Sequence, residues 1–173
     1  MKDYIQLTRA AIDAATEGIT PSELVQHPEG KWCAAEVLEH LGMAYSGTTK
    51  SLEKALQAGQ PAVTSKNMKQ HVFSFVVVGL GHLPGGRKAP PMTIPRNLAP
   101  EQALDTTCRN LEEMGAALAR CADKFGTRIK LNDHPILGSF NIAEWRKFHY
   151  VHTRHHMKQI QRLRSEGAGG AWA

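Results

Sequence analysis

Four histidines lie within fifteen residues near the end of the chain, in the segment WRKFHYVHTRHHMKQ at 145–159. His152 and His156 are four residues apart, so on a helix their side chains lie on one face, about one turn apart. Neutral imidazole is a common ligand of Zn, Ni, Fe and Cu ions. The pair therefore predicts part of a metal site, although this spacing alone also fits two polar surface residues.

A third imidazole is expected from the segment 33–58. His40 lies there in a stripe of small and apolar residues at helical spacing, formed with Cys33, Val37, Ala44 and Gly47. Three neutral imidazoles from two facing helices leave coordination positions open, which is typical of a catalytic rather than a structural site. His40, His152 and His156 are the predicted ligands of a divalent metal. Zn and Ni are favoured, and Fe and Cu also fit.

Neighbouring residues on the last helix have other predicted roles. His149 is about two turns, or ~10 Å, from His156, so it is predicted to be a hydrogen-bonded pocket residue rather than a ligand. Gln159 lies one turn from His156, and either orients that ring or is a surface amide. His155 points about 100° away from His156 and is predicted to lie on the surface.

Two residues near His40 have alternative interpretations. Glu36 lies one turn before His40, where it would support a ligand or stabilise the N-terminus of its helix. Cys33 lies at the N-terminus of the same helix, where a thiol can have a depressed pKa. A small buried residue is the alternative for Cys33, and we favour it. No Ser/His/Asp or Cys/His catalytic set is evident, and the catalytic residues themselves are not predicted.

The elements that must position these residues are helices. Apolar periodicity, proline and glycine punctuation and capping-box spacing predict four principal helices and one short helical turn. The capping boxes are Thr20 with Glu23 and Asn141 with Glu144. The predicted principal helices are 4–17, 33–58, 100–125 and 141–166, and the turn is 20–24.

A long connection joins the second and third principal helices at roughly 60–99. Residues 67–80 fit a short helix, whereas the run VVV favours a strand for which no partner is evident. Four amphipathic helices must bury their apolar stripes against one another. The predicted fold is all-α: a four-helix bundle with a long crossover between helices 2 and 3. One domain is expected at 1–166, followed by a flexible tail at 167–173.

Composition restricts the setting and the partners. The 173 residues carry a net charge of +5, which permits an anionic partner without requiring one. The three cysteines form no CxxC motif and are odd in number, so a reducing cytoplasmic setting is expected. The N-terminus lacks the apolar stretch of a signal peptide, and the longest apolar run, 72–81, is too short to span a bilayer. No membrane association is expected.

Two stretches carry a family resemblance. The segment AAEVLEHLGMA after Trp32, with EWRKFHYVHTRHHMKQI near the end, resembles the DinB-like superfamily of bacterial metal-binding four-helix bundles. Residues 134–160 are similar to a branch with the pattern HP-x-x-G … EW … H-x-x-HH-x-x-Q. The helix layout fits nearly the whole chain, but the specific motifs are confined to about 32–43 and 134–160. Family members often have Ser or Thr as a helix cap where this chain has Cys33.

The resemblance implies a ligand set and a range of activities. The family holds its metal with one histidine of the second helix and an HxxxH pair of the fourth, which correspond here to His40, His152 and His156. Relatives include S-transferases and isomerases that use bacillithiol, mycothiol or glutathione. The implied function is a metal-dependent thiol S-transferase or hydrolase that acts on a small molecule, with a low-molecular-weight thiol as a candidate cofactor.

Two other classes of function remain open, and the sequence does not decide whether the protein is an enzyme. One is a non-catalytic metal-binding module of the stress response. The other is nucleic-acid binding, suggested by basic residues on the last helix. These residues scatter around the helix without a recognised DNA motif, so a solvated surface is favoured and no nucleic-acid partner is expected. A homodimer is compatible with the sequence. The basic residues are Arg146, Lys147, Arg154, Lys158, Arg162 and Arg164.

Overall fold

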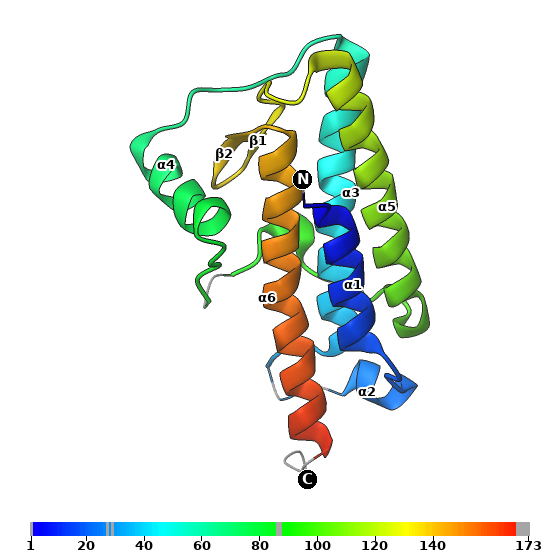
Figure 1. Ribbon diagram of the computed structural model, residues 1–173. Helices are drawn as coiled ribbons and strands as arrows, with labels where there is room; N and C mark the ends of the chain where they lie inside the picture. The colour runs from blue at the N-terminus through cyan, green and yellow to red at the C-terminus, as the bar shows by residue number, and fades with distance from the viewer. Residues whose placement is uncertain (1, 27, 29, 86–87, 169–173) are drawn as a thin grey trace.

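The computed structural model describes residues 2–26, 28, 30–85 and 88–168, and it is a four-helix bundle built from α1, α3, α5 and α6 (Figure 1). Shorter elements occupy the connections. The bounds are α1 Tyr4–Thr16, α2 Pro21–Val25, α3 Ala34–Ala58, α4 Met68–Ser74, the π-helical turn η1 Phe75–Gly79, the 3-10 turn η2 Pro91–Thr93, α5 Pro100–Phe125, β1 Asn132–His134, β2 Gly138–Phe140 and α6 Ile142–Ala168.

The capping interactions predicted from the sequence set two helix starts. Thr20 and Glu23 form a capping box at α2. At α6, Asn141 Oδ1 accepts a hydrogen bond from Glu144 N, while Glu144 Oε2 accepts one from Asn141 N. Both predicted boxes are confirmed. Gly59 ends α3 with a φ of 73°, a left-handed conformation that glycine adopts without steric cost.

Hydrogen bonds between helices define the order and direction of the bundle. Thr107 Oγ1 donates to Leu38 O near the start of α3, and Lys124 Nζ donates to Leu56 O near its end. The second contact lies further towards the C-terminus than the first on both helices, so α3 and α5 are parallel. Arg164 of α6 donates to Ala15 O at the end of α1, and these two helices also run side by side in one direction (Figure 1).

The two parallel pairs are antiparallel to each other. His40 near the start of α3 contacts His156 of α6, while Thr48, further along α3, contacts the earlier His149. Their interface is the core, and the largest fully buried side chains include Tyr45, Leu38, Leu52, Leu111 and Ile160. Because α3 and α5 are parallel, the connection between them must return along the length of the bundle.

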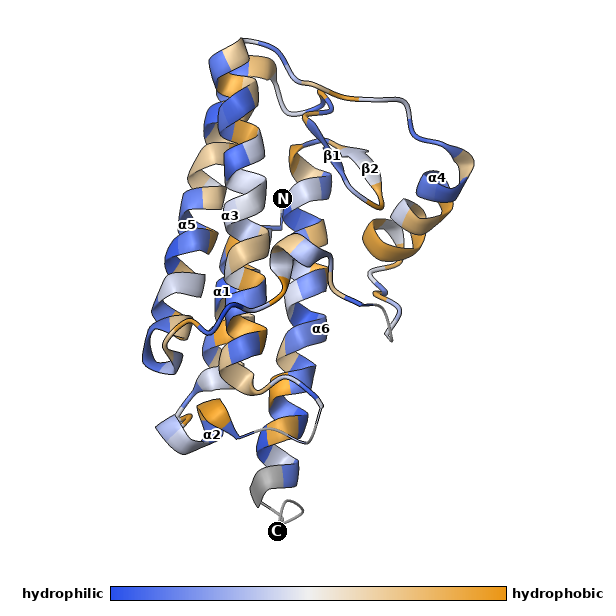
Figure 2. Cartoon of the chain, turned by 180° about the vertical axis from the view of Figure 1, so that it is seen from behind, coloured by the Kyte–Doolittle hydropathy of each residue, from blue (hydrophilic) through white to orange (hydrophobic). Residues whose placement is uncertain are grey.

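The connection begins with helical rather than extended structure. Residues 68–79 form α4 and η1, so the helical interpretation of this region is correct and the strand suggested by VVV is wrong. Hydrophobic residues gather at the end of α4 and in the following turn (Figure 2). Further along, the carboxylate of Glu39 on α3 accepts hydrogen bonds from Arg96 N and Leu98 N, which fixes the end of the connection against the bundle.

A small antiparallel hairpin was not predicted. Its strands β1 and β2 pair Asn132 with Phe140 and His134 with Gly138, just before α6. At the C-terminus, α6 extends to Ala168, two residues beyond the predicted end, and the rest of the predicted tail lies outside the described residues. Within the described ranges, none of the helices has the length and apolarity needed to cross a bilayer.

Candidate metal centre

His40 lies on the face of α3 that meets α6, and only 4% of its surface is exposed. Its Nδ1 is 2.8 Å from the carbonyl oxygen of Thr93 in η2. A carbonyl oxygen only accepts hydrogen bonds, so this contact assigns the proton to Nδ1. The lone pair of His40 is therefore on Nε2, on the opposite side of the ring.

His152 and His156 lie one turn apart on α6 and face His40. The Nε2 atom of His152 is 3.3 Å from Nε2 of His40 and 3.1 Å from Nε2 of His156. The ligating atoms of all three residues lie within 4.8 Å of one another. In a tetrahedral zinc site with Zn–N distances of about 2.1 Å, nitrogen ligands are about 3.4 Å apart. The two short separations are close to that value.

Gln159 fixes the ring of His156. Its Oε1 is 3.1 Å from His156 Nδ1, an acceptor position that assigns the proton to Nδ1 and the lone pair to Nε2. Two lone pairs, from His40 and His156, then face Nε2 of His152. If His152 carried its proton there, it would bond to only one of them. A cation at this point would satisfy all three nitrogens at once.

Protons are unfavourable occupants of this cluster. Burial lowers the pKa of His152 well below its usual range, with the neighbouring His156 and His40 adding to the effect. Burial also lowers the pKa of His156 to about 4 and lowers the pKa of His40. The imidazoles are therefore neutral near pH 7, which is the form that binds metals. His152 Nδ1 is buried and has no hydrogen-bond partner among the described residues.

His149 belongs to a different layer of the same interface. It is 1% exposed, and its Nε2 is 3.0 Å from Thr48 Oγ1. Its ring stacks on Trp145 and meets Tyr45 edge-on. Burial, with a smaller effect of His134, lowers its pKa to about 3. The structure thus places His149 as a buried, hydrogen-bonded residue outside the triad.

The residues before His40 stabilise the start of α3. Glu36 Oε2 accepts a hydrogen bond from Cys33 N at 2.8 Å, which supports the helix-terminus interpretation of Glu36. Cys33 is buried, and burial raises the pKa of its thiol. The idea of a depressed pKa at Cys33 is therefore wrong, because the loss of water outweighs the backbone hydrogen bonds from Glu36 and Ala35, and the favoured small buried residue is what is observed.

The surroundings of the triad include residues that were not predicted or were placed differently. His155 was expected on the surface, but it is partly buried and its ring centroid is 5.2 Å from that of His156. Thr93 acts through its backbone carbonyl, which has no sequence signal. Glu39 did have one, since it is an acidic residue on a strongly apolar helix beside His40.

Comparison with known proteins gives the class of the molecule. Residues 4–160 match the family model of the DinB superfamily, and the chain belongs to this family. Among solved structures it is similar to YfiT from Bacillus subtilis, described as a probable metal-dependent hydrolase with an unusual four-helix bundle topology. That match has a TM-score of 0.57 and 19% identity, and covers 98% of this chain and 87% of the other. No curated protein matches the chain significantly.

Proposed function

We propose that the protein is a metal-dependent enzyme whose divalent ion is held by the Nε2 atoms of His40, His152 and His156. The carrying observation is the convergence of the three rings, with separations of 3.3 and 3.1 Å between their facing nitrogens. The hydrogen bonds of His40 to Thr93 and of His156 to Gln159 support it, because metal-binding imidazoles usually donate their other N–H to such partners.

Three neutral ligands leave room for a further one, and a divalent ion in such a site lowers the pKa of a water or a thiol enough to give a nucleophile near pH 7. The chain's own residues hold the three lone pairs at fixed positions. Thr93 O and Gln159 Oε1 keep the rings of His40 and His156 in one tautomer. Burial keeps all three imidazoles unprotonated.

Hydrolysis is the reaction class that we put first. The structural relative YfiT is described as a probable metal-dependent hydrolase, and its fold is shared over 98% of this chain. The cysteines do not offer an internal nucleophile, because Cys33, Cys108 and Cys121 are buried and burial raises the pKa of each thiol. A nucleophile would therefore come from solvent or from a small molecule.

Thiol S-transfer is the second candidate, and it rests on the resemblance to thiol-dependent relatives. Because none of the chain's own thiols is exposed, the reaction would need an external thiol such as bacillithiol, mycothiol or glutathione. A non-catalytic metal-binding role in a stress response is the remaining alternative. Hydrolysis, S-transfer and a non-catalytic role differ in the ligand that exchanges at the fourth coordination position of the metal, which is water, an external thiol or neither.

The experiment uses the protein purified without a histidine tag and loaded with Co²⁺. For a hydrolase, we expect one metal per chain, d–d bands that shift with pH as water ionises, and metal-dependent turnover in a panel of esters and amides. For an S-transferase, an added thiol would produce a sulfur-to-metal charge-transfer band that is lost in His40→Ala. A bound metal that responds to neither would contradict an enzymatic role.

A further inference from the structure

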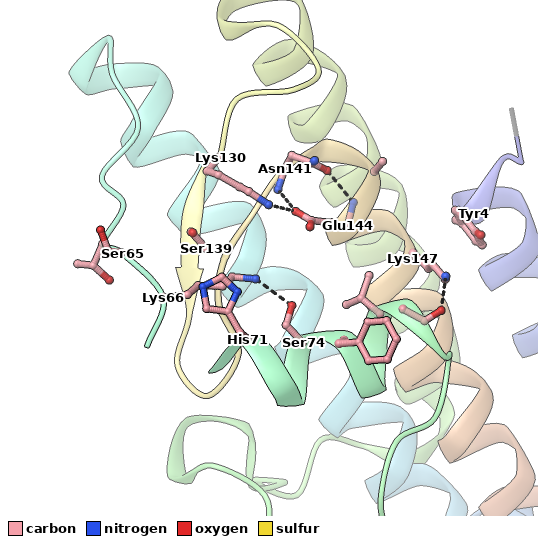
Figure 3. A pocket seen from close by; sticks show the side chains of 15 residues that line it. Tyr4, Ser65, Lys66, His71, Ser74, Lys130, Ser139, Asn141, Glu144 and Lys147 are labelled. Atoms are coloured by element: carbon pink, nitrogen blue, oxygen red, sulfur yellow. Dashed lines mark hydrogen bonds and ion pairs between the residues drawn. The ribbon is translucent and has the colours of Figure 1, made fainter. Parts of the chain in front are cut away.

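A cavity lies outside the histidine triad, beside the hairpin and the start of α6 (Figure 3). Its volume is about 880 Å³, and its walls come from α4, η1, β2, the first turns of α6 and Tyr4 of α1. None of the three triad histidines lines it. A volume of this size is in the range of small-molecule sites, and it is far larger than a single inorganic ion needs.

Three lysines from separate segments line the cavity, but only one has a carboxylate partner among the described residues. Lys130 pairs with Glu144, the sole carboxylate in the lining, which also accepts the Asn141 N–H. Lys147 Nζ donates to Gly79 O at 3.1 Å, and Lys66 Nζ donates to Ser74 Oγ at 2.8 Å (Figure 3). Two ammonium groups thus have only neutral partners.

Lys66 is the more confined of these two groups. Its Nζ lies 4.5 Å from the centre of the Phe140 ring, and its stem packs so closely on the hairpin that a Cβ on Gly138 would lie 2.7 Å from Lys66 Cγ. Burial lowers its pKa and the nearby Lys130 adds to this effect, while Glu144 and Asp133 act in the opposite direction. A partly desolvated cation without an ion-pair partner is unfavourable, and a bound anion would offset that cost.

The remaining walls add hydrogen-bond donors and an apolar surface. Ser139 is 6% exposed, lines the cavity, and its hydroxyl makes no hydrogen bond within the described residues. Phe75 also lines the cavity, yet 63% of its surface is exposed, which is unusual for an aromatic side chain. Val78 lies in the same wall. The cavity therefore offers the ammonium group of Lys66 and the hydroxyl of Ser139 on one side, and on the other the apolar surface of η1 with Lys147 beside it (Figure 3).

We infer that this cavity binds a small organic anion, with a carboxylate or phosphate group near Lys66 and Ser139 and an aryl or alkyl body against Phe75. The inference is independent of the proposed metal function, since it uses none of the triad residues. Lysine provides a flexible point charge rather than a planar fork, so the site does not discriminate between the two anionic groups by geometry. The titration below distinguishes a preference for carboxylate from a preference for phosphate.

The test is an NMR titration of ¹⁵N-labelled protein at constant ionic strength. The probes are phenyl phosphate and phenylacetate, with inorganic phosphate and neutral benzyl alcohol as comparisons. We expect saturable shifts at residues 66, 138 and 139 with the aryl anions, and weaker binding of inorganic phosphate. The aryl anion that binds with the higher affinity identifies the preferred anionic group. Equal binding of benzyl alcohol, or no saturable binding of either aryl anion, would overturn the inference.

Charge variants locate the site. Lys66→Met should weaken the aryl anion at least about tenfold, the loss expected for one charge-assisted contact. Lys124→Met is the matched control, because Lys124 also donates to a neutral oxygen and lies 5.6 Å from a phenyl ring centre, but lines no part of the cavity. Equal weakening in both would show non-specific attraction and reject the site. Should circular dichroism show that Lys66→Met is unfolded, Ser139→Ala takes its place, and it should weaken the aryl anion while Lys124→Met does not.

A final arm separates the cavity from the triad. Phosphates and carboxylates are also metal ligands, so the titration is repeated with His152→Ala. Unchanged affinity supports the cavity, whereas loss of binding would assign the anion to the triad and overturn the inference.

Discussion

The interface between α3 and α6 contains two neighbouring histidine layers that differ in what their nitrogens meet. In one layer, His149 Nε2 contacts the hydroxyl of Thr48, and the hydroxyls of Tyr45 and Thr153 bond to each other. In the other, Nε2 of His152 meets Nε2 of both His40 and His156. The three α6 histidines, His149, His152 and His156, lie on one continuous face of that helix.

On the proposed metal site, the difference implies that burial and helix face alone do not define a metal ligand. A hydroxyl both donates and accepts, so it complements either nitrogen of a neutral imidazole. Another imidazole whose Nδ1 proton is already engaged presents only a lone pair. The Nε2 atom of His149 therefore has a protein hydroxyl as partner, while its Nδ1 has none among the described residues, and we predict that the triad is completed by a cation. Four changes test this contrast.

The largest effect is expected from His152→Ala. The central nitrogen of the triad is removed, so metal content measured by inductively coupled plasma mass spectrometry should fall from one ion per chain to none. The helical circular dichroism should remain, because the core of leucine, isoleucine and tyrosine side chains does not contain the ion. His155→Ala serves as the control on the same turn and should keep its metal. Equal loss in the control would remove the distinction between faces.

His149→Ala should have the reverse effect. It leaves a cavity and removes the partner of the Thr48 hydroxyl, so the free energy of unfolding should fall by about 2–4 kcal/mol. The measurement is urea denaturation of the metal-free protein. Metal stoichiometry should stay at one per chain, and a variant that lost its metal would make His149 part of the centre.

Acid should destabilise the protein through His149. Its folded pKa of about 3 is below the unfolded value of about 6.5, so below pH 6.5 the unfolded chain binds a proton that the folded chain does not. Stability should therefore fall as pH drops from 6.5 towards 3, by about 1.4 kcal/mol per pH unit for this one group. Denaturation at several pH values should give a shallower dependence in His149→Ala. Identical slopes would show that His149 does not titrate in this way.

Gln159→Leu should have the smallest effect on the centre. The ligand His156 remains, but the acceptor that fixes its ring is lost, and removing such partners typically lowers metal affinity about 10–100-fold. Competition with a chromogenic chelator measures the change. Unaltered affinity would mean that Gln159 is only a surface amide beside the site.

The helices could be predicted because each carries its own periodic pattern and caps. The same periodicity brought His40, His152 and His156 to one interface, and whether they bind a metal stays a prediction. The hairpin was missed because its strands have three residues each and depend on tertiary contacts, such as the hydrogen bond between Asn132 and Ser51 of α3. VVV forms a π-helical turn because tertiary context overrides a weak strand preference.

Other parts of the site had no residue signal to predict from. Thr93 contributes a backbone carbonyl, a group that every residue has, so only the path of the connection identifies it. That path depends on Glu39, an acidic residue that stands out in the sequence beside His40, but the backbone N–H groups that its carboxylate binds have no sequence signal. At Cys33 the position allowed a depressed thiol pKa, although a small buried residue was favoured, and burial raises the pKa.

The parallel arrangement of α3 and α5 has a consequence for synthesis. Their contacts join residues far apart in sequence, such as Leu38 and Thr107, which are 69 residues apart. A ribosome that adds about 5–20 residues per second needs roughly 3–14 s to synthesise the 69 residues from Leu38 of α3 to Thr107 of α5. During that interval, α3 has no partner for the face that carries Leu38, Leu41 and Leu52, all fully buried in the finished protein. Nascent chains of this topology should therefore depend on chaperones more than those of an up-and-down bundle, in which each helix pairs with the one just made.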